Sequence, residues 1–121
     1  MEPLELAWAG GLFEGEGCFT VQRQGGKVYP VASITTTDRS TLDRFVGAVG
    51  MGKVYGPYRQ GGKGTLPVYR WQVYSAKVGH LLHRLDPWLS DRRRTRARDV
   101  LYSPQQHGTA PSRWRPEART S

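Results

Sequence analysis

This sequence of 121 residues contains little cysteine, little acidic charge and no long apolar run. Cys18 is its single cysteine, which excludes an internal disulfide and a cysteine-rich zinc site. No segment reaches the roughly 18 consecutive apolar residues that a membrane-spanning helix needs. The first five residues also lack the basic flank and apolar core of a signal peptide. We therefore expect a cytoplasmic, intracellular protein with no membrane partner.

The scarcity of acidic residues leaves a strongly basic chain. Lysine and arginine number 18 against 10 aspartates and glutamates, which gives a formal net charge of +8. A surface of this sign suits a polyanionic partner, and nucleic acid fits better than a membrane because no lipid anchor is visible. Solubility alone is the alternative explanation of the charge. The length predicts one domain.

Hydrophobic spacing divides the chain into alternating helical and extended segments. Proline at position 3, the pair Gly25–Gly26, Asp38 and Gly50 mark helix starts, a hairpin turn and a helix stop. The order predicts an α+β fold, helix-hairpin-helix-hairpin-helix-helix, with a twisted antiparallel sheet covered by helices on one face. We predict one domain over 1–102 and a basic flexible tail over 103–121. The expected helices are 3–16, 38–49, 76–85 and one from about 90, and the expected strands are 18–24, 27–35, 53–59 and 66–75.

A glycine-rich stretch at the end of the first expected helix carries two acidic residues, Glu14 and Glu16. Glycine inside a helix costs about 1 kcal/mol relative to alanine, so its repetition here needs a reason. Small residues let another backbone approach closely, whereas acidic residues at a helix C-terminus are disfavoured by the macrodipole. A bound cation would offset that charge, and Mg²⁺ and Ca²⁺ prefer such oxygen ligands.

The run from Ala9 to Phe19, AGGLFEGEGCF, resembles the signature of the LAGLIDADG homing endonucleases. Glutamate replaces aspartate at both acidic positions of the motif. The resemblance implies a homing endonuclease that makes a double-strand break in a long, near-palindromic DNA site by metal-dependent hydrolysis. It implies Mg²⁺, with Ca²⁺ or Mn²⁺ able to substitute for binding, no small-molecule cofactor, and an intron-encoded or phage-encoded mobile gene.

The motif occurs once, and single-motif members of the family are homodimers. The resemblance therefore implies a homodimer whose interface contains Ala7, Gly10, Gly11 and Glu14. Close contact of the small residues would bring the two acidic helix ends together at the two-fold axis.

Three residues take the family's catalytic positions by resemblance. Glu16 falls on the metal-binding acid, Thr36 on a polar residue that positions solvent, and Arg92 on a basic residue, usually lysine, near the active site. Arginine stabilises phosphate charge but does not act as an acid at neutral pH. Thr37 is the neighbouring alternative for the position given to Thr36. The alternative roles are surface carboxylates beside a turn for the acidic pair, strand-end capping for Thr36, and an ordinary phosphate contact for Arg92.

The exposed parity of the expected strands supplies candidates for DNA reading. A twisted antiparallel sheet can lie in the major groove and present alternate side chains to base edges. A solvated sheet face would have a similar composition, and the basic stretches 59–63 and 92–98 favour DNA because they could follow phosphates. The predicted DNA-binding residues are Gln22, Gln24, Lys27, Tyr29, Ser33, Tyr55, Arg59, Arg70, Gln72, Arg93 and Arg94.

Two rival functions remain open at this stage. The glutamate at position 16 and the arginine at position 92 favour a cleavage-deficient DNA-binding protein or RNA maturase on the same fold. A basic RNA-binding α+β protein unrelated to the family would require the motif to be a coincidence. Intein splicing is disfavoured because the chain lacks a leading nucleophile and room for a splicing domain.

Overall fold

Helices and strands follow one another in the predicted order in the computed structural model, which describes residues 2–59 and 64–102. The predicted tail over 103–121 lies outside the described residues, and the last helix ends at Tyr102. A short 3-10 turn that contains Pro87, η1, separates the last two helices. The elements are α1 (Pro3–Glu16), β1 (Gly17–Gln24), β2 (Lys27–Thr36), α2 (Arg39–Val49), β3 (Lys53–Tyr58), β4 (Val68–Tyr74), α3 (Ala76–Leu85), η1 (Asp86–Trp88) and α4 (Asp91–Tyr102).

Local signals in the sequence set most of these boundaries. Proline opens α1, and the Asp38 side chain caps α2 by accepting a hydrogen bond from the Ser40 amide at 3.0 Å. Gly25 and Gly26 have φ of 60° and 79°, as a two-residue hairpin turn requires. Gly50 ends α2 in the left-handed conformation that glycine adopts without strain.

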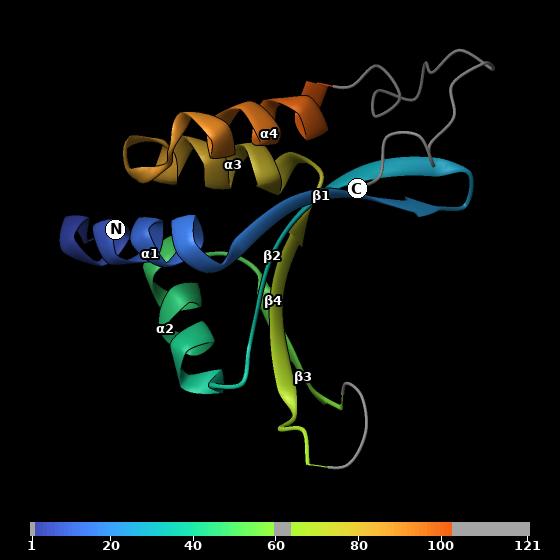
Figure 1. Cartoon of the computed structure of the whole chain (residues 1–121). Helices are drawn as coiled ribbons and strands as arrows, with labels where there is room; N and C mark the ends of the chain where they lie inside the picture. Colours follow the sequence, from blue (N-terminus) through green and yellow to red (C-terminus); the bar gives the residue numbers. More distant parts are fainter. Residues whose placement is uncertain (1, 60–63, 103–121) are drawn as a thin grey trace.

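Within the described residues, the strands form one four-stranded antiparallel sheet in the order β1-β2-β4-β3. The β1–β2 and β3–β4 hairpins join through β2 and β4, so β1 and β3 are the edges. In Figure 1 the β1–β2 hairpin projects beyond the helices and the β3–β4 hairpin extends in another direction. The sequence predicted both hairpins but not the order in which they join.

Pro30 lies in the central strand β2, although proline lacks the N–H that a sheet ladder uses. Its carbonyl accepts a hydrogen bond from the Ser75 amide at 2.9 Å, so the backbone groups of Pro30 face β4. Pairing between β2 and β4 begins one residue later, at Val31 and Tyr74. The missing N–H therefore falls just outside the ladder, and the strand tolerates proline.

The core lies between the helices and one face of the sheet. Phe13 of α1 and Phe45 of α2 meet Phe19 and Trp71 of the sheet, with ring centroids 4.8 Å apart for Phe13 and Phe19 and 4.6 Å apart for Phe45 and Trp71. The Trp71 indole N–H donates to the Met51 carbonyl at 3.0 Å, which satisfies its one polar atom in the core. These aromatic contacts fix α1 and α2 against the sheet.

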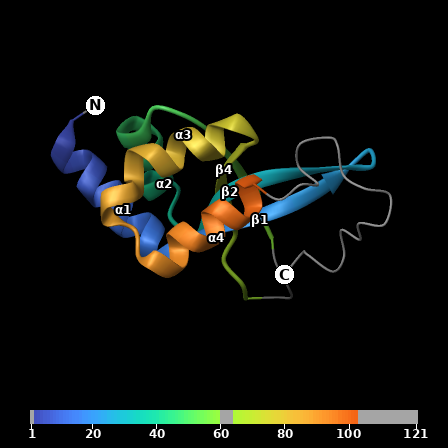
Figure 2. The ribbon, with the colours of Figure 1, turned by 90° about the horizontal axis from the view of Figure 1, so that it is seen from above.

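The helices cover only one of the two sheet faces (Figures 1 and 2). Side chains alternate along each strand, so Phe19, Ile34 and Trp71 enter the core while their neighbours in sequence point to the opposite side. This is the α+β layer that the sequence predicted. Among the described residues, no helix combines the length and apolarity that a membrane crossing requires.

Candidate functional site

The sheet face turned away from the helices, which we call the open face, carries polar and basic side chains. The part of it that the structure describes contains lysine and arginine but neither aspartate nor glutamate. Such a surface suits an anionic partner. By the register of the strands it consists of Cys18, Thr20, Gln22, Gln24, Lys27, Tyr29, Val31, Ser33, Thr35, Lys53, Tyr55, Tyr58, Val68, Arg70, Gln72 and Tyr74.

Most of the predicted DNA-reading residues lie on the open face. Arg59 follows the end of β3, and its guanidinium donates to the Thr65 carbonyl at 3.2 Å across the described part of the hairpin loop. The predicted contact of each residue with DNA stays a prediction. Those on the open face are Gln22, Gln24, Lys27, Tyr29, Ser33, Tyr55, Arg70 and Gln72.

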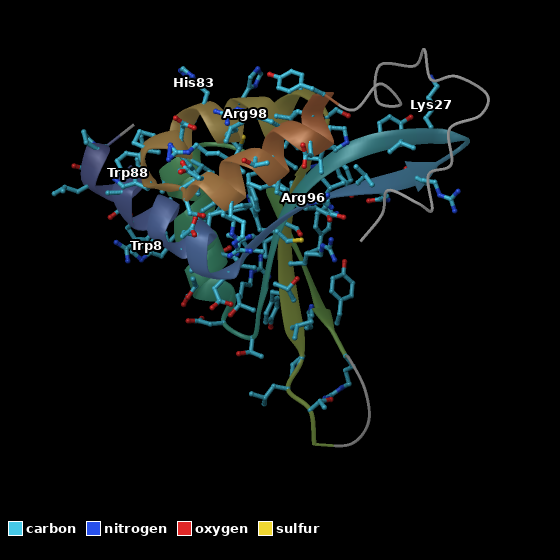
Figure 3. All side chains as sticks on the ribbon, turned by 45° about the horizontal axis from the view of Figure 1, so that its top comes forward. Trp8, Lys27, His83, Trp88, Arg96 and Arg98 are labelled. Atoms are coloured by element: carbon cyan, nitrogen blue, oxygen red, sulfur yellow. The ribbon has the colours of Figure 1, made fainter. Side chains whose placement is uncertain are left out.

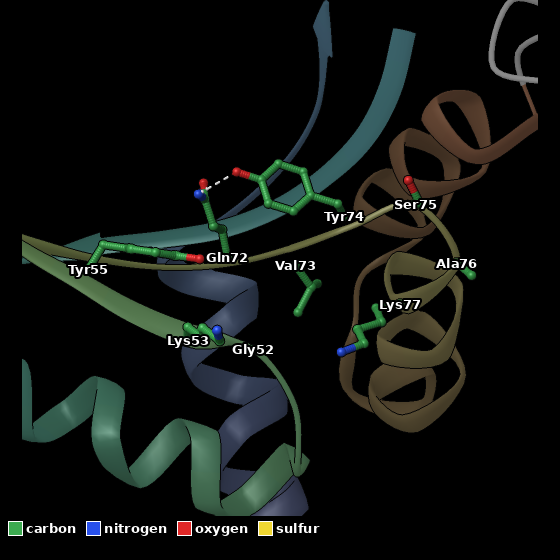
Figure 4. A pocket seen from close by; sticks show the side chains of 9 residues that line it. All are labelled: Gly52, Lys53, Tyr55, Gln72, Val73, Tyr74, Ser75, Ala76 and Lys77. Carbon is green, nitrogen blue, oxygen red and sulfur yellow. Dashed lines mark hydrogen bonds between the residues drawn. The ribbon is translucent and has the colours of Figure 1, made fainter. Parts of the chain in front are cut away.

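A hydrogen-bonded chain of side chains runs along β4 on the open face. Arg70 Nε donates to Gln72 Oε1 at 3.0 Å, and Gln72 Nε2 donates to the Tyr74 hydroxyl at 2.6 Å (Figure 4). Arg70 Nη2 also donates to Ser33 Oγ on β2 at 3.5 Å. Ser33 is only 5% exposed, because this short side chain on a central strand lies under the longer ones of β4.

Two hollows flank this chain. One of about 340 Å³ is lined by Gln22, Thr35 and the β4 side chains. The other, of about 410 Å³, lies where β3 begins beside the start of α3, and Lys53 and Lys77 line it (Figure 4). The open face is therefore a ridge of hydrogen-bonded side chains with space on both sides.

The C-terminus of α1 meets the open face at Glu16. This residue ends the helix and is exposed. Gly17 pairs with Ile34, so Thr35, the residue after Ile34, lies beside the helix end. Thr35 in turn pairs with Arg70, which places an exposed carboxylate at the margin of the arginine-bearing face.

Glu14, two residues earlier in α1, is held by the residue that precedes α4. Its carboxylate accepts a hydrogen bond from the Ser90 amide at 2.9 Å. That bond, together with the nearby charges of Arg93 and Arg92, lowers the pKa of Glu14. The Glu14 carboxylate therefore links the end of α1 to the start of α4.

The arginine side chains of α4 have three kinds of surroundings: the carbonyls of β1, the nearby Asp91 and solvent. Arg93 donates to the Gly17 carbonyl, and Arg96 donates to the Phe19 carbonyl at 3.1 Å. Figure 3 labels Arg96 and Arg98 on α4. Gly17 and Phe19 are two residues apart on the edge strand β1, so their carbonyls point to the same side. Arg94 pairs with Asp91 at 3.2 Å, whereas Arg92 is exposed.

The intramolecular contacts of α4 limit which of its arginines are available to bind a phosphate. Arg93 and Arg94, both predicted to bind DNA, are half-buried and engaged with their own chain. Arg92, predicted to act in catalysis, and Arg98 project outward from α4. The sequence shows five arginines in this stretch, and the structure assigns three of them to intramolecular contacts.

Several solved structures with this arrangement of helices and strands are homing endonucleases. The homing endonuclease I-CvuI, determined with a DNA target and with Mg present, is 23% identical over 82% of this chain and 64% of its own, with a TM-score of 0.62. The archaeal intron-encoded homing endonuclease I-Vdi141I, complexed with DNA, is 22% identical over 82% and 67%, with a TM-score of 0.60. I-TnaI, also a homing endonuclease, is 19% identical over 78% and 67%, at 0.58.

The chain has the LAGLIDADG homing endonuclease fold. No family model and no curated protein sequence matches it, so the likeness is one of structure. The chain spans 64% of the length of I-CvuI. The resemblance of the AGGLFEGEGCF run is thereby supported, because that run forms α1 and the start of β1 in the LAGLIDADG fold.

Thr36 lies at the end of β2 in this LAGLIDADG fold, and its hydroxyl already has a partner. Thr36 Oγ1 accepts a hydrogen bond from the Asp38 amide at 3.3 Å, which is the strand-end capping considered as its alternative role. Thr35, its neighbour, is exposed on the open face. The catalytic role of Thr36 stays a prediction, and the strand register places Thr35 next to the end of α1.

The residues predicted for a dimer interface face different ways on α1. Gly10 is covered by its own chain, since a Cβ there would lie 2.5 Å from Cβ of Trp88. Gly11 has open space beside it, and Ala7 is half-buried. Contact of these residues and of Glu14 with a second copy stays a prediction.

No cluster of three or more histidine, cysteine, aspartate or glutamate side chains occurs among residues 2–59 and 64–102. Glu16 stays the predicted carboxylate ligand of a metal ion, which would take its other ligands from carbonyl, water or phosphate oxygens. That donor set fits a hard divalent cation, which retains several non-protein oxygen ligands.

Several residues of the open face escaped the sequence-based selection. Strand parity alone also places Thr20, Thr35, Lys53 and Tyr74 on this face. The hydrogen bond from Gln72 to Tyr74 depends on the packing of neighbouring side chains, which the alternation of residues does not reveal.

Proposed function

We propose that this protein is a site-specific DNA endonuclease that binds duplex DNA along the open face. The proposal is carried by one observation: a sheet face without acidic residues adjoins an exposed carboxylate, Glu16, in the LAGLIDADG fold. The net charge of +8 supports a polyanionic partner. I-CvuI and I-Vdi141I, which share the fold, were determined with DNA.

Base recognition rests on the open face. Its strands offer amide, hydroxyl and guanidinium groups at alternate positions, the groups that hydrogen-bond base edges in the major groove. Lys27 near the hairpin tip and Lys53 at the sheet edge would contact phosphates, which set position rather than sequence preference (Figure 3).

Hydrolysis centres on Glu16. A divalent cation, when bound, supplies activation of water and stabilises the departing oxygen. Glu16 would hold that ion, Thr35 or Thr36 would order a water molecule, and Arg92 would stabilise phosphate charge without transferring a proton. Glu14 keeps the helix end in place through the Ser90 amide.

A second copy of the chain completes the site in this proposal. One chain presents a single Glu16, whereas a double-strand break needs a carboxylate for each strand. The open surface at Gly11 allows a second α1 to approach, and Ala7 lies on the same helix one turn away. Each subunit then reads one half of a near-palindromic site.

Cleavage is tested with the full chain, a library of duplex sites and Mg²⁺. Glu16→Gln should abolish cutting while binding persists, because the amide keeps the size of the side chain and loses the charge that holds the ion. Asp99→Asn, a matched change of an exposed acid on α4, should cut normally. Cutting that survives Glu16→Gln would show that another residue holds the metal.

A second function is favoured by glutamate at position 16 and arginine at position 92. Binding without cutting in both wild type and Glu16→Gln would identify a DNA-binding protein that has lost cleavage. The same experiment is repeated with structured RNA. Tighter binding to structured RNA than to duplex DNA, without cutting, would favour an RNA maturase.

A further inference from the structure

Arg70 is held in place on the open face before any ligand arrives. Its Nε donates to Gln72 and its Nη2 reaches Ser33, at 3.0 and 3.5 Å. Gln72 is held in turn by Tyr74. A long, flexible side chain loses rotamer entropy when it binds, and contacts made beforehand reduce that cost.

The same contacts decide which protons of Arg70 remain for a partner. Its guanidinium keeps both Nη1 protons and one Nη2 proton, for which no acceptor occurs among the residues that the structure describes. These protons form the end of the guanidinium fork. Two parallel N–H donors match the O6 and N7 acceptors that guanine presents in the major groove.

Gln72 has a partner at both ends of its amide. Its Oε1 accepts a hydrogen bond from Arg70, and its Nε2 donates to the Tyr74 hydroxyl, the contact drawn in Figure 4. One oxygen lone pair and one N–H remain, but the two contacts fix the orientation of the amide. Its geometry therefore suits the support of Arg70 better than direct reading of a base.

We propose that Arg70 selects guanine at one base pair of each half-site, and that Gln72 and Ser33 are positioning residues for it. This inference rests on the proposed binding of DNA by the open face. The hollow of about 340 Å³ beside Arg70 gives a base edge room to approach. The open face brings no described carboxylate to compete for the guanidinium.

The test selects bound duplexes from a randomised library with the full chain, in Ca²⁺ and at several salt concentrations. Wild type should show a guanine preference of about 5- to 150-fold at one position of the half-site. Arg70→Lys keeps the charge and loses the fork, so the preference should fall while the salt slope is unchanged. Arg70→Gln should lose the preference as well. Arg39→Gln, the same change on α2 behind the sheet, should retain it.

Two variants separate positioning from folding. Gln72→Leu removes the acceptor for Nε and should weaken the guanine preference at that same position. Gln72→Glu keeps an acceptor and should preserve the preference even as overall affinity falls. Circular dichroism and tryptophan emission should match wild type, because these side chains lie outside the core.

The outcomes distinguish the inference from the proposed function. A wild-type protein that selects a sequence, with Arg70→Lys and Arg70→Gln selecting the same one, overturns the guanine assignment alone. A uniform affinity loss in Arg70→Gln, with a salt slope smaller by about 0.9, identifies a phosphate contact instead. A wild type that selects no duplex sequence overturns the proposed function and the inference together.

Discussion

Gly52 occupies a backbone position that excludes a side chain. Its φ is +90°, and a Cβ there would lie 2.7 Å from Cε2 of the buried Trp71. Gly52→Ala should lower the free energy of unfolding by about 3 kcal/mol, since backbone strain and overpacking of the core add. Urea titration followed by tryptophan emission measures the change.

Gly47 provides the matched control for this substitution. It lies in α2 with no heavy atom within 4 Å of an added Cβ. Gly47→Ala should therefore raise the unfolding free energy by about 0.5 to 1 kcal/mol. Equal effects of the two substitutions would contradict the contact between Gly52 and Trp71.

The Glu14 carboxylate should make the stability of the fold depend on pH in the acidic range. Its pKa is lowered in the folded protein by the Ser90 amide and by Arg93 and Arg92. A depressed carboxyl pKa stabilises the fold above the ordinary glutamate value of about 4.3, and this contribution is lost as pH falls through the folded value. Glu14→Gln should remove that part of the decline.

The measurement for Glu14 is a series of urea midpoints from neutral to acidic pH. The wild-type midpoint should fall more steeply with acid than that of Glu14→Gln, and the two curves should converge at the lowest pH. Parallel curves would show that the contact with Ser90 does not lower the pKa of Glu14 enough to affect stability.

The two glycines after α2 also show where single-residue prediction ends. The sequence predicted that Gly50 stops a helix, and Gly50 is the C-cap of α2. Gly52 instead makes room for Trp71, which comes from β4. Local pattern predicts a turn, but it cannot predict which distant side chain will lie against it.

At the scale of elements, α4 covers the free edge of the sheet. Arg93 and Arg96 donate to carbonyls of β1 that no strand pairs with. Replacing both arginines with methionine should destabilise the fold by about 2 to 5 kcal/mol, since hydrogen bonds from charged donors are lost while the apolar stems remain. Arg98→Met, at an exposed position, should have little effect.

Thermal unfolding monitored by circular dichroism tests the role of α4. Amide exchange in α4 should also accelerate in the double variant, because the helix loses its attachment to the sheet. A double variant as stable as Arg98→Met would show that the packing of Ala97 and Val100 alone holds α4.

The arginines of α4 were predictable as a basic stretch but not in their separate roles. Periodicity gave the helix, and Pro87 its boundary with α3. An arginine can donate either to a phosphate or to a carbonyl of its own chain. Arg93 and Arg96 meet carbonyls of β1 because β1 is an edge strand. The order of the strands in the sheet, which makes β1 an edge, could not be predicted from the sequence.

At the scale of the whole molecule, the proposed dimer depends on open space along α1. Gly11→Leu adds bulk where no atom of the chain lies within 4 Å. The variant should keep its fold and become monomeric at micromolar concentration, with cleavage lost. Sedimentation equilibrium measures the change, with Thr95→Leu on α4 as the control for added surface bulk.

A Gly11→Leu protein that remains dimeric would contradict this interface and direct attention to another surface. The motif predicted α1 and its acidic end, yet it could not tell Gly10 from Gly11. Gly10 is covered by Trp88 of η1, and only folding of the chain brings those residues together.

The strict alternation of side chains across the sheet has a consequence for how such a protein can change over generations. Replacements at Gln22 or Gln24 alter what the outer surface offers to a partner, while Phe19 and Trp71 continue to hold the interior. New binding preferences can therefore arise by single steps that leave foldedness intact. Residues that stabilise the fold and residues that face a partner therefore lie on opposite sides of the sheet, and the second group can be substituted without loss of the first.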